Sequence, residues 1–348
     1  MSTKWTPKVE KAAALLKELD KVIVEYDHIK RQILLLLIAD QHGLLKSMPG
    51  LGKTMLVNTL QKCIAGSRSA RLQMTPDMKP SDILGFEYFN PKTGEMMLKK
   101  GPIVDADILL ADEVNRTTAK TNSALLQGMQ ERKVMVGDAQ FDLSQMFLVL
   151  ATINPAEMGG EGTFTLPEAM LDRFTASLDM DYISRAGEIE MLRRASLHGR
   201  GATAQVQQVL TVEDVFAMRA QHAQVVENTI KAGTLLEFIV DLVRSSRPGK
   251  PEFKALMERC GKPLDDYVKF GMSPRAEIAS LHLACALAYL DGRDVATPDD
   301  VKAVFRDIAR HRIIMRETAE MNDITSDHVI NEILGPEKGV PIIEPRAR

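Results

Sequence analysis

The most constraining feature of the sequence is a glycine-rich loop between a strand-like segment and a helical one. Gly43–Lys46 reads as a short buried strand, and the loop Ser47–Thr54 follows it directly. Apolar spacing after the loop indicates a helix. Gly50 and Gly52 let the backbone turn so that successive N–H groups point at one place, next to a helix N-terminus whose dipole favours negative charge. The sequence therefore predicts a phosphate-binding loop.

The residues of this loop follow the Walker A pattern except at its first position. Lys53 is able to reach the β- and γ-phosphates of a nucleotide, and the Thr54 hydroxyl is able to ligate Mg²⁺. Ser47 stands where the pattern has glycine, and it would cost about 1 kcal/mol if that position required a positive φ. A glycine-rich turn beside a lysine is the alternative. The expected nucleotide contacts along the loop are Pro49, Gly50, Leu51, Gly52, Lys53, Thr54 and Met55.

A second apolar strand ends in two adjacent carboxylates, which is the Walker B arrangement. The strand is Ile108–Ala111, and Asp112 and Glu113 follow it. Asp112 would hold Mg²⁺, and Glu113 would polarise the attacking water, as phosphoryl transfer requires. A strand that ends in solvated acids is the alternative, which the preceding Walker A loop disfavours. The two motifs together predict a site that binds ATP with Mg²⁺ and hydrolyses it.

Three polar residues further along the chain are candidates for the same site. Asn154 follows an apolar strand and could hold the attacking water or contact the γ-phosphate. Arg173 could neutralise transition-state charge in a neighbouring subunit, and Arg275 could couple a second domain to the nucleotide. Taken singly, each residue also has an ordinary explanation. These are a turn at Asn154, a local ion pair of Arg173 with Asp172 or Glu168, and a solvated first helical turn at Arg275.

Strand and helix patterns alternate in the first half of the chain, which predicts an α/β fold with a mostly parallel sheet between helices. Two β-hairpins interrupt the alternation, at about 83–100 and 133–143. Strands are expected at 70–74, 108–111, 146–153 and 175–180, and helices at 8–19, 27–39 and 118–130, the first of them capped by Thr6.

The second half of the chain reads as a smaller all-α domain. Helices are expected at 212–223, 226–246, 274–290 and 298–313. Thr297 and Pro298 form a helix-start signature, with a capping hydroxyl and proline in the first turn. The expected domains are an N-terminal helix (1–20), a nucleotide-binding core (21–185), a linker (186–210), a helical lid (211–334) and a flexible tail (335–348).

Composition excludes several classes of protein. The three cysteines form no Cys-x-x-Cys pair, so neither a disulfide framework nor a structural zinc site is expected, and a reducing cytoplasm fits. No signal peptide is apparent, and the apolar run 33–39 is far shorter than the roughly 20 residues that span a bilayer. A net charge of −3 provides no general attraction for nucleic acid. The basic clusters 193–194 and 310–312 are interpreted as solvated helix faces.

These motifs, in this order, resemble the MoxR family of AAA+ ATPases. The resemblance implies that Asn154 is sensor 1, Arg173 the arginine finger and Arg275 sensor 2. It also implies that the hairpins are the family's helix-2 insert (83–100) and pre-sensor-1 hairpin (133–143). The segments that carry the resemblance include 49–54, 75–77, 80–83, 92–95, 100–103, 111–116, 124–132, 166–174, 273–276, 297–301 and 310–313.

Further expectations follow from the resemblance. Such proteins form hexameric rings with ATP sites between subunits and remodel protein clients, often with a von Willebrand factor A domain partner, to mature enzymes or insert metals. Three features depart from the family: Ser47, Glu25 where glycine usually lies near the adenine, and a longer loop at 154–166 that carries Gly159-Gly160-Glu161-Gly162. Two alternatives stay open: a nucleic-acid-dependent ring motor, because the first hairpin carries aromatic residues and lysines, and a scaffold that binds ATP with negligible turnover.

Overall fold

The computed structural model describes residues 5–154, 163–164, 166–198 and 205–335. These residues form two compact units. The first comprises residues up to Met170 together with Leu178–Ala220, and the second comprises Leu171–Ser177 together with the chain from Gln221 onward. The expectations for the Gly159–Gly162 loop, for part of the linker (199–204) and for the tail beyond 335 lie outside the described residues.

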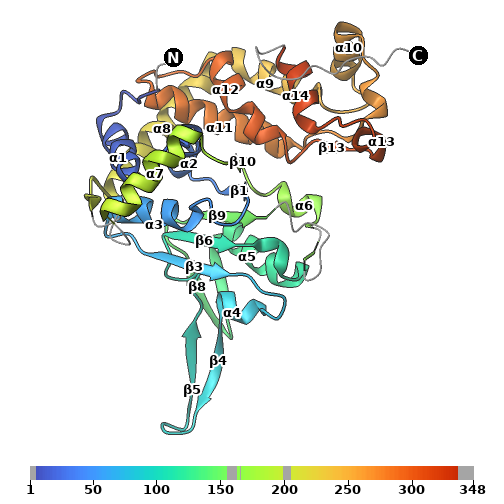
Figure 1. Cartoon of the computed structure of the whole chain (residues 1–348). Coiled ribbons are helices and arrows are strands. Elements are labelled where there is room, and N and C mark those ends of the chain that lie inside the picture. Colours follow the sequence, from blue (N-terminus) through green and yellow to red (C-terminus); the bar gives the residue numbers. More distant parts are fainter. Residues whose placement is uncertain (1–4, 155–162, 165, 199–204, 336–348) are drawn as a thin grey trace. The chain divides into compact units, whose positions relative to one another are not determined.

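A five-stranded sheet forms the centre of the first unit, with the strand order β10-β1-β9-β6-β3 (Figure 1). Adjacent strands from β1 to β3 pair in parallel, and β6 and β9 are buried along their whole length. A mostly apolar strand buried on both faces is typical of a parallel sheet covered by helices, so the predicted α/β class is confirmed. The strands are β1 (Gly43–Ser47), β3 (Ser69–Gln73), β6 (Ile108–Asp112), β9 (Leu148–Ile153) and β10 (Ala176–Met180).

The helices beside this sheet include α1 (Glu10–Val22), α2 (Asp27–Ile38), α3 (Lys53–Cys63) and α5 (Ala119–Glu131). α1 packs against both α2 and α3. The apolar run in α2 is core, because the side chains from Ile33 to Ile38 are at most 1% exposed. Within the described ranges, no helix is long and apolar enough to cross a membrane.

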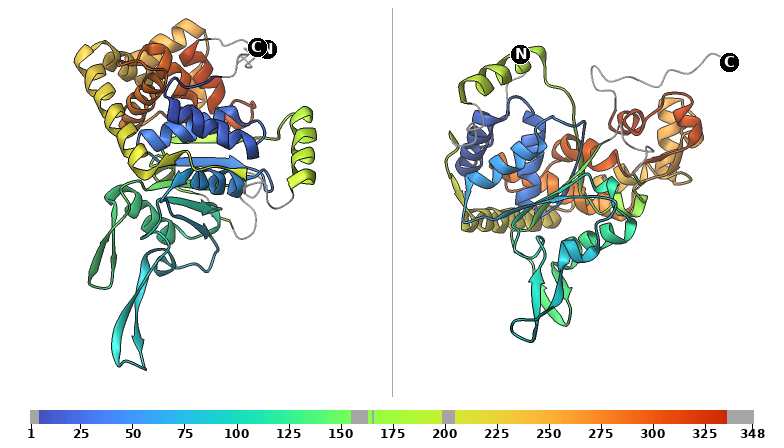
Figure 2. Two further views of the ribbon diagram at one scale, coloured as in Figure 1. Left: turned by 90° about the vertical axis from the view of Figure 1, so that its left-hand side faces the viewer. Right: turned by 60° about the horizontal axis from the view of Figure 1, so that its bottom comes forward.

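Two antiparallel hairpins extend from the first unit. β4 (Gly85–Asn90) and β5 (Glu95–Lys100) follow the short helix α4 (Pro80–Leu84), and this hairpin projects away from the sheet (Figure 2). Glycine is required at the base of the hairpin, since a Cβ at Gly85 or Gly101 would lie 2.3 or 2.0 Å from a backbone oxygen. The second hairpin joins β7 (Lys133–Val136) to β8 (Ala139–Asp142).

The second unit is mainly helical, as the helical patterns in the second half of the sequence predict. α11 (Pro274–Leu290) packs against α9 (Thr234–Arg244) and α12 (Pro298–Ala309), and its residues Leu283–Ala286 are fully buried. Further elements are α8 (Val212–Ala232), which begins in the first unit, α10 (Pro251–Cys260), α13 (Glu317–Glu320), α14 (Ser326–Leu334), the short 3-10 helix Leu264–Asp266, and the strand pair β12 (Val268–Phe270) and β13 (Ile314–Met315).

Some boundaries differ from the sequence expectations. α1 begins at Glu10 after Val9, so Thr6 does not cap it. The break expected near residue 225 lies at Gly233, whose φ of 79° ends α8. No proline or glycine interrupts the chain near 225, so nothing there stops the helix. The short strands β12 and β13 lie where only helices were expected, because two residues of pairing leave no periodic pattern.

Candidate nucleotide-binding site

The phosphate-binding loop has the backbone conformation that its glycines suggest. Gly50 and Gly52 have φ values of 85° and 87°, and Gly52 is the left-handed N-cap of α3. A Cβ added at either position would meet no described heavy atom within 4 Å. Glycine is therefore favoured by the positive φ rather than by crowding. Lys53 opens the helix and is buried, and its Nζ donates to the Ser47 carbonyl oxygen at 3.4 Å.

Ser47 occupies its unusual position without backbone strain. It is the last residue of β1, and it is not among the described residues with positive φ. Its side chain is buried, and its Oγ donates to the Met48 carbonyl oxygen at 3.1 Å. The cost that a positive φ would have brought therefore does not arise.

Thr152, in the middle strand β9, fixes both carboxylate residues of the neighbouring strand. Its Oγ1 donates to Asp112 Oδ1 at 2.6 Å and accepts the backbone N–H of Glu113 at 2.8 Å. Glu113 itself has a φ of 59°, so the chain turns sharply at the strand end. Sequence reasoning missed Thr152, although a hydroxyl in an otherwise apolar strand is the pattern that could have revealed it.

Two side chains from β3 also contact the acids. Arg71 Nη2 donates to Asp112 Oδ2 and to Gln73 Oε1, both at 2.6 Å, and Gln73 Nε2 donates to Glu113 Oε2 at 2.8 Å. Arg116 Nε lies 3.2 Å from the same Glu113 oxygen. Residues 71 and 73 share one face of a strand, which is why both side chains reach β6. Asp112 is thus hydrogen-bonded at both oxygens.

Five predicted site residues lie at or after the carboxyl ends of the adjacent parallel strands β1, β9 and β6. The carboxyl ends of such strands lie at one edge of a sheet, the usual place for ligands in α/β folds. Asn154 directly follows β9 and is 2% exposed. β9 lies between β1 and β6 in the sheet. The residues at this edge are Lys53, Thr54, Asp112, Glu113 and Asn154.

A cavity of about 360 Å³ adjoins the phosphate-binding loop within the first unit. Its size and its mostly apolar lining suit a purine base. Besides the loop, it is formed by the segment before α2, by the end of β10 and by α7 (Arg185–His198). The lining residues are Val22, Ile23, Val24, Tyr26, Pro49, Gly50, Leu51, Gly52, Met55, Leu56, Met180, Tyr182, Ile183, Glu188 and Met191.

Glu25 joins the two walls of this cavity. Its carboxylate accepts the backbone N–H of Ser184 at 2.9 Å and also the Ser184 hydroxyl. These hydrogen bonds lower the pKa of Glu25. Gly187 leaves room for the carboxylate, because a Cβ there would lie 2.6 Å from Glu25 Oε1. Beside it, Tyr26 Oη donates to the Asp181 carbonyl oxygen at 2.7 Å. The residue that departs from the family pattern thus has a structural contact at the start of α7.

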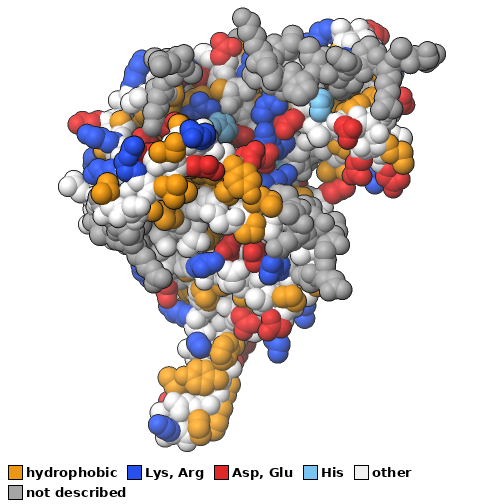
Figure 3. Space-filling model, in the orientation of Figure 1, with side chains coloured by type: hydrophobic (Ala, Val, Ile, Leu, Met, Phe, Trp, Pro, Cys, Tyr) orange, Lys and Arg blue, Asp and Glu red, His pale blue; other side chains and the backbone are white. Residues whose placement is uncertain are grey.

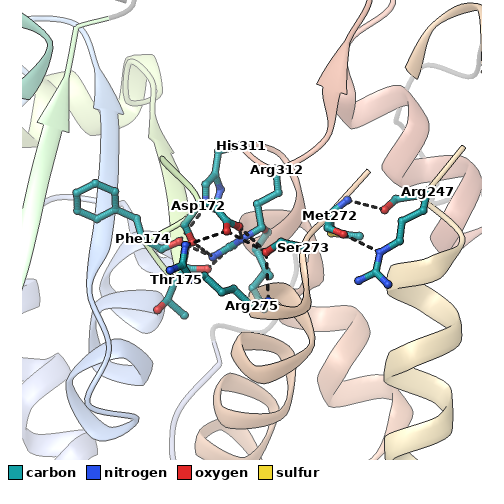
Figure 4. A network of polar contacts seen from close by, with 11 residues as sticks. Asp172, Phe174, Thr175, Arg247, Met272, Ser273, Arg275, His311 and Arg312 are labelled. Atoms are coloured by element: carbon teal, nitrogen blue, oxygen red, sulfur yellow. Dashed lines mark hydrogen bonds and ion pairs between the residues drawn. The ribbon is translucent and has the colours of Figure 1, made fainter. Parts of the chain in front are cut away.

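The two candidate arginines lie in the second unit, within Leu171–Ser177 and at the start of α11. Arg275 Nη1 lies 3.2 Å from Asp172 Oδ2, so Arg275 is ion-paired although its side chain is 46% exposed. Ser273 and Arg312 also bind the Asp172 carboxylate (Figure 4). The roles of Arg173 and Arg275 at the nucleotide stay predictions.

The interpretation of 310–312 as a solvated face is wrong. His311 and Arg312 are each 5% exposed, and the Arg310 side chain is 12% exposed and pairs with Asp327. Arg312 lies in the turn that follows α12, and it bonds the segment that carries Arg173. Burial lowers the pKa of Arg312 to about 10. From the sequence alone, a charged residue is expected to be exposed, because a buried partner far away in the chain cannot be recognised.

The fold and the arrangement of loop and acids define an ATPase of the AAA class. Residues 42–176 match the family model described as the ATPase family associated with various cellular activities (AAA), and residues 264–333 match the AAA lid domain. The chain belongs to the MoxR family of AAA+ ATPases, as its relatives show.

These relatives cover most of the chain. It is 35% identical to Chaperone MoxR1 of Mycobacterium tuberculosis, over 91% of this chain and 79% of the relative. It is also 35% identical to the uncharacterized protein YeaC of Bacillus subtilis, over 94% of both chains. A crystal structure of a protein from Cytophaga hutchinsonii is 36% identical and matches with a TM-score of 0.81, over 96% of this chain and 95% of that one.

Proposed function

We propose that this protein is a Mg²⁺-dependent ATP hydrolase that forms a cytoplasmic hexameric ring and remodels protein clients. The observation that carries the proposal is the position of Lys53, Thr54, Asp112 and Glu113 at one edge of the sheet, with the acids held in place by Thr152. A preorganised set of donors and carboxylates is what phosphoryl transfer needs, because catalysis there is mostly positioning and charge stabilisation.

In the reaction, water attacks the γ-phosphorus, the bond from that phosphorus to ADP breaks, and ADP and inorganic phosphate are the products. Each residue has a defined task in this reaction. The loop amides and Lys53 bind the phosphates, and Glu113 polarises the attacking water. Asn154 holds that water or a γ-phosphate oxygen. Arg173 of a neighbouring subunit neutralises charge in the transition state, and Arg275 senses the nucleotide.

The residues present fit Mg²⁺. A hydroxyl at Thr54 and a buried carboxylate at Asp112 are hard oxygen ligands, and Mg²⁺ in nucleotide sites usually takes one or two protein ligands plus phosphate and water. When bound, the ion would neutralise phosphate charge. Arg71 occupies one Asp112 oxygen, but its side chain is 50% exposed and can move into solvent.

The β4–β5 hairpin supports a protein client. Six large apolar side chains on it are between 39% and 62% exposed, and Figure 3 shows apolar side chains gathered on the hairpin at the bottom of the view. Exposed apolar patches on soluble proteins mark interaction sites, and methionine adapts to varied partners. The six are Phe86, Tyr88, Phe89, Met96, Met97 and Leu98. Such a surface suits clients that need activation, assembly or metal insertion and that are presented by a von Willebrand factor A domain partner.

A nucleic-acid-dependent motor is the second candidate. Lys99 Nζ lies 5.5 Å from the centre of the Phe86 ring, and a lysine beside an aromatic ring suits a single strand, whose bases stack and whose phosphates attract cations. ATPase stimulation by single-stranded DNA that weakens steeply with salt would favour this candidate.

The central experiment compares ATP turnover and ATP binding for the wild type and three variants. Lys53→Ala, Glu113→Gln and Arg173→Ala should each lower turnover by about 100-fold or more. Glu113→Gln should keep its ATP affinity, because it retains the loop. Wild-type rates in all three variants would refute the hydrolase, and tight ATP binding by a wild type without turnover would indicate a scaffold.

A further inference from the structure

The segment that carries Arg173 is packed as part of the helical unit. Leu171–Ser177 clusters with the chain beyond Gln221, although the residues on either side of it belong to the first unit. Figure 4 shows a polar network that joins this segment to the start of α11 and to the turn after α12. The network is centred on two side chains, Asp172 and Arg312.

Arg312 holds the backbone on both sides of Arg173. Its Nη2 donates to the carbonyl oxygens of Asp172 (3.1 Å) and Phe174 (2.6 Å), and its Nη1 donates to that of Thr175 (2.9 Å). Its Nε donates to Asp172 Oδ1 at 2.9 Å. The Arg312 side chain is 2% exposed. Only a planar guanidinium offers donors in this forked geometry, so one side chain binds three backbone carbonyl oxygens of the segment at once.

Asp172 receives donors from α11 as well. Ser273 Oγ lies 2.9 Å from both carboxylate oxygens, and Arg275 Nη1 lies 3.2 Å from Oδ2. His311 Nε2 lies 3.0 Å from the Phe174 carbonyl oxygen, which adds a second contact from the turn after α12. Arg275 is therefore bound to the carboxylate of Asp172, the residue directly before Arg173 in the chain.

We propose that Arg312 and Asp172 are positioning residues that hold Arg173 and Arg275 to the helical unit as one group. A movement of this unit therefore moves both arginines together. The inference rests on the proposed function, because it gives Arg173 a role at the nucleotide of a neighbouring subunit. Arg312 does not touch the nucleotide; it acts through Arg173.

A double-mutant cycle tests this. Arg312→Lys keeps the charge and removes the fork, and Arg312→Ala removes both. In the otherwise wild-type chain each should lower kcat by about tenfold to 100-fold, because misplacing a catalytic group by about 1 Å costs that much, while KM stays within about twofold. In the Arg173→Ala background the same changes should have no further effect on kcat. A general loss of folding would lower activity in both backgrounds.

Arg306→Ala is the matched control. Arg306 lies in α12, before the turn that carries Arg312, and it pairs with Asp327 at 3.2 Å and Asn331 at 2.5 Å. Its removal should lower the melting temperature while kcat stays at the wild-type value. Full kcat in Arg312→Lys and Arg312→Ala, or equal losses with and without Arg173, would overturn the inference alone. A fully active Arg173→Ala variant would overturn the arginine's proposed role and the inference with it.

Mixed oligomers supply an independent readout. Subunits with Arg312→Lys keep their own acids, and subunits with Glu113→Gln keep a well-placed Arg173. Mixing them should give more ATP turnover than the two separate preparations together, because each variant supplies what its neighbour lacks. Turnover equal to the average of the separate preparations would show that Arg312 acts within its own subunit and would overturn the inference.

Discussion

Two arginine–aspartate pairs, one in each unit, differ in solvent exposure. The exposed pair is able to exchange its partner, whereas the buried pair is permanent. Arg71 binds Asp112 at 2.6 Å, but the arginine side chain is 50% exposed. Arg312 binds Asp172 at 2.9 Å, and its side chain is 2% exposed. Water can replace the first guanidinium as soon as it leaves, whereas loss of the second leaves buried acceptors without donors.

The difference suits the two places. If Asp112 binds Mg²⁺ as proposed, it has to exchange a protein donor for the metal ion, and a solvent-accessible partner suits that exchange. Asp172 precedes Arg173, which we propose it keeps oriented, and its partner Arg312 is buried and donates to several acceptors. The same two residue types thus serve opposite purposes, and the extent of burial decides which.

The largest expected effect concerns stability in the second unit. Arg312→Ala should destabilise this unit by about 3–5 kcal/mol, the cost of removing one partner from a buried ion pair. Arg71→Ala, which deletes the same atoms at the exposed pair, should cost less than about 1 kcal/mol. Hydrogen exchange of the α11 and α12 amides measures the loss of stability in Arg312→Ala, and that of the β6 and β9 amides measures the loss in Arg71→Ala. Equal losses for the two variants would remove the distinction between the pairs.

A smaller effect is expected at the hydroxyl that holds the two acids. Thr152→Val keeps the shape but removes the donor to Asp112 and the acceptor for the Glu113 N–H, which should cost about 1–3 kcal/mol and about tenfold in kcat. Thr59→Val is the control, because the Thr59 hydroxyl bonds the Met55 carbonyl oxygen inside α3, away from the acids. If both variants kept wild-type kcat, Thr152 would have no part in placing the acids.

A still smaller effect should appear in the metal requirement. If Arg71 competes with the ion for Asp112, Arg71→Ala should lower the Mg²⁺ concentration for half-maximal ATPase activity by about two- to fivefold, the range that exposed ion pairs contribute. Arg68→Ala is matched in type and strand region, and Arg68 pairs instead with Asp105 and Asp107. An unchanged or raised Mg²⁺ requirement in Arg71→Ala alone would contradict an exchangeable contact.

The smallest effect is a pH dependence at Glu25. Hydrogen bonds from Ser184 lower the pKa of Glu25 below its usual value of 4.5, so the ionised carboxylate is favoured in the folded protein. The stabilisation is present above that value and is lost as the pH falls through the lowered pKa. Ser184→Ala should therefore reduce the melting temperature at pH 7 and approach the wild type in strong acid. A difference that is constant with pH would show that the contact does not depend on the charge.

The local parts of the site were predictable from the sequence. Gly50 and Gly52 have their positive φ because the loop between a strand and a helix needs it, and the Asp112–Glu113 pair ends a strand whose apolar residues identify it. The positions of β1, β6 and β9 followed from the same patterns. The partners of the acids did not, because Thr152 and Arg71 come from other strands and their side chains become neighbours only through sheet register.

By itself, the sequence determined the α/β class of the core, its phosphate-binding loop, the acidic strand end and the helical second half, because these depend on periodicity and on residues adjacent in the chain. The tertiary structure decided that Arg312 is buried, that Leu171–Ser177 packs with the helical unit and that Glu25 binds the start of α7. These facts depend on contacts between residues more than 100 positions apart. A free side chain has no preference among such partners until folding brings one of them within hydrogen-bond distance.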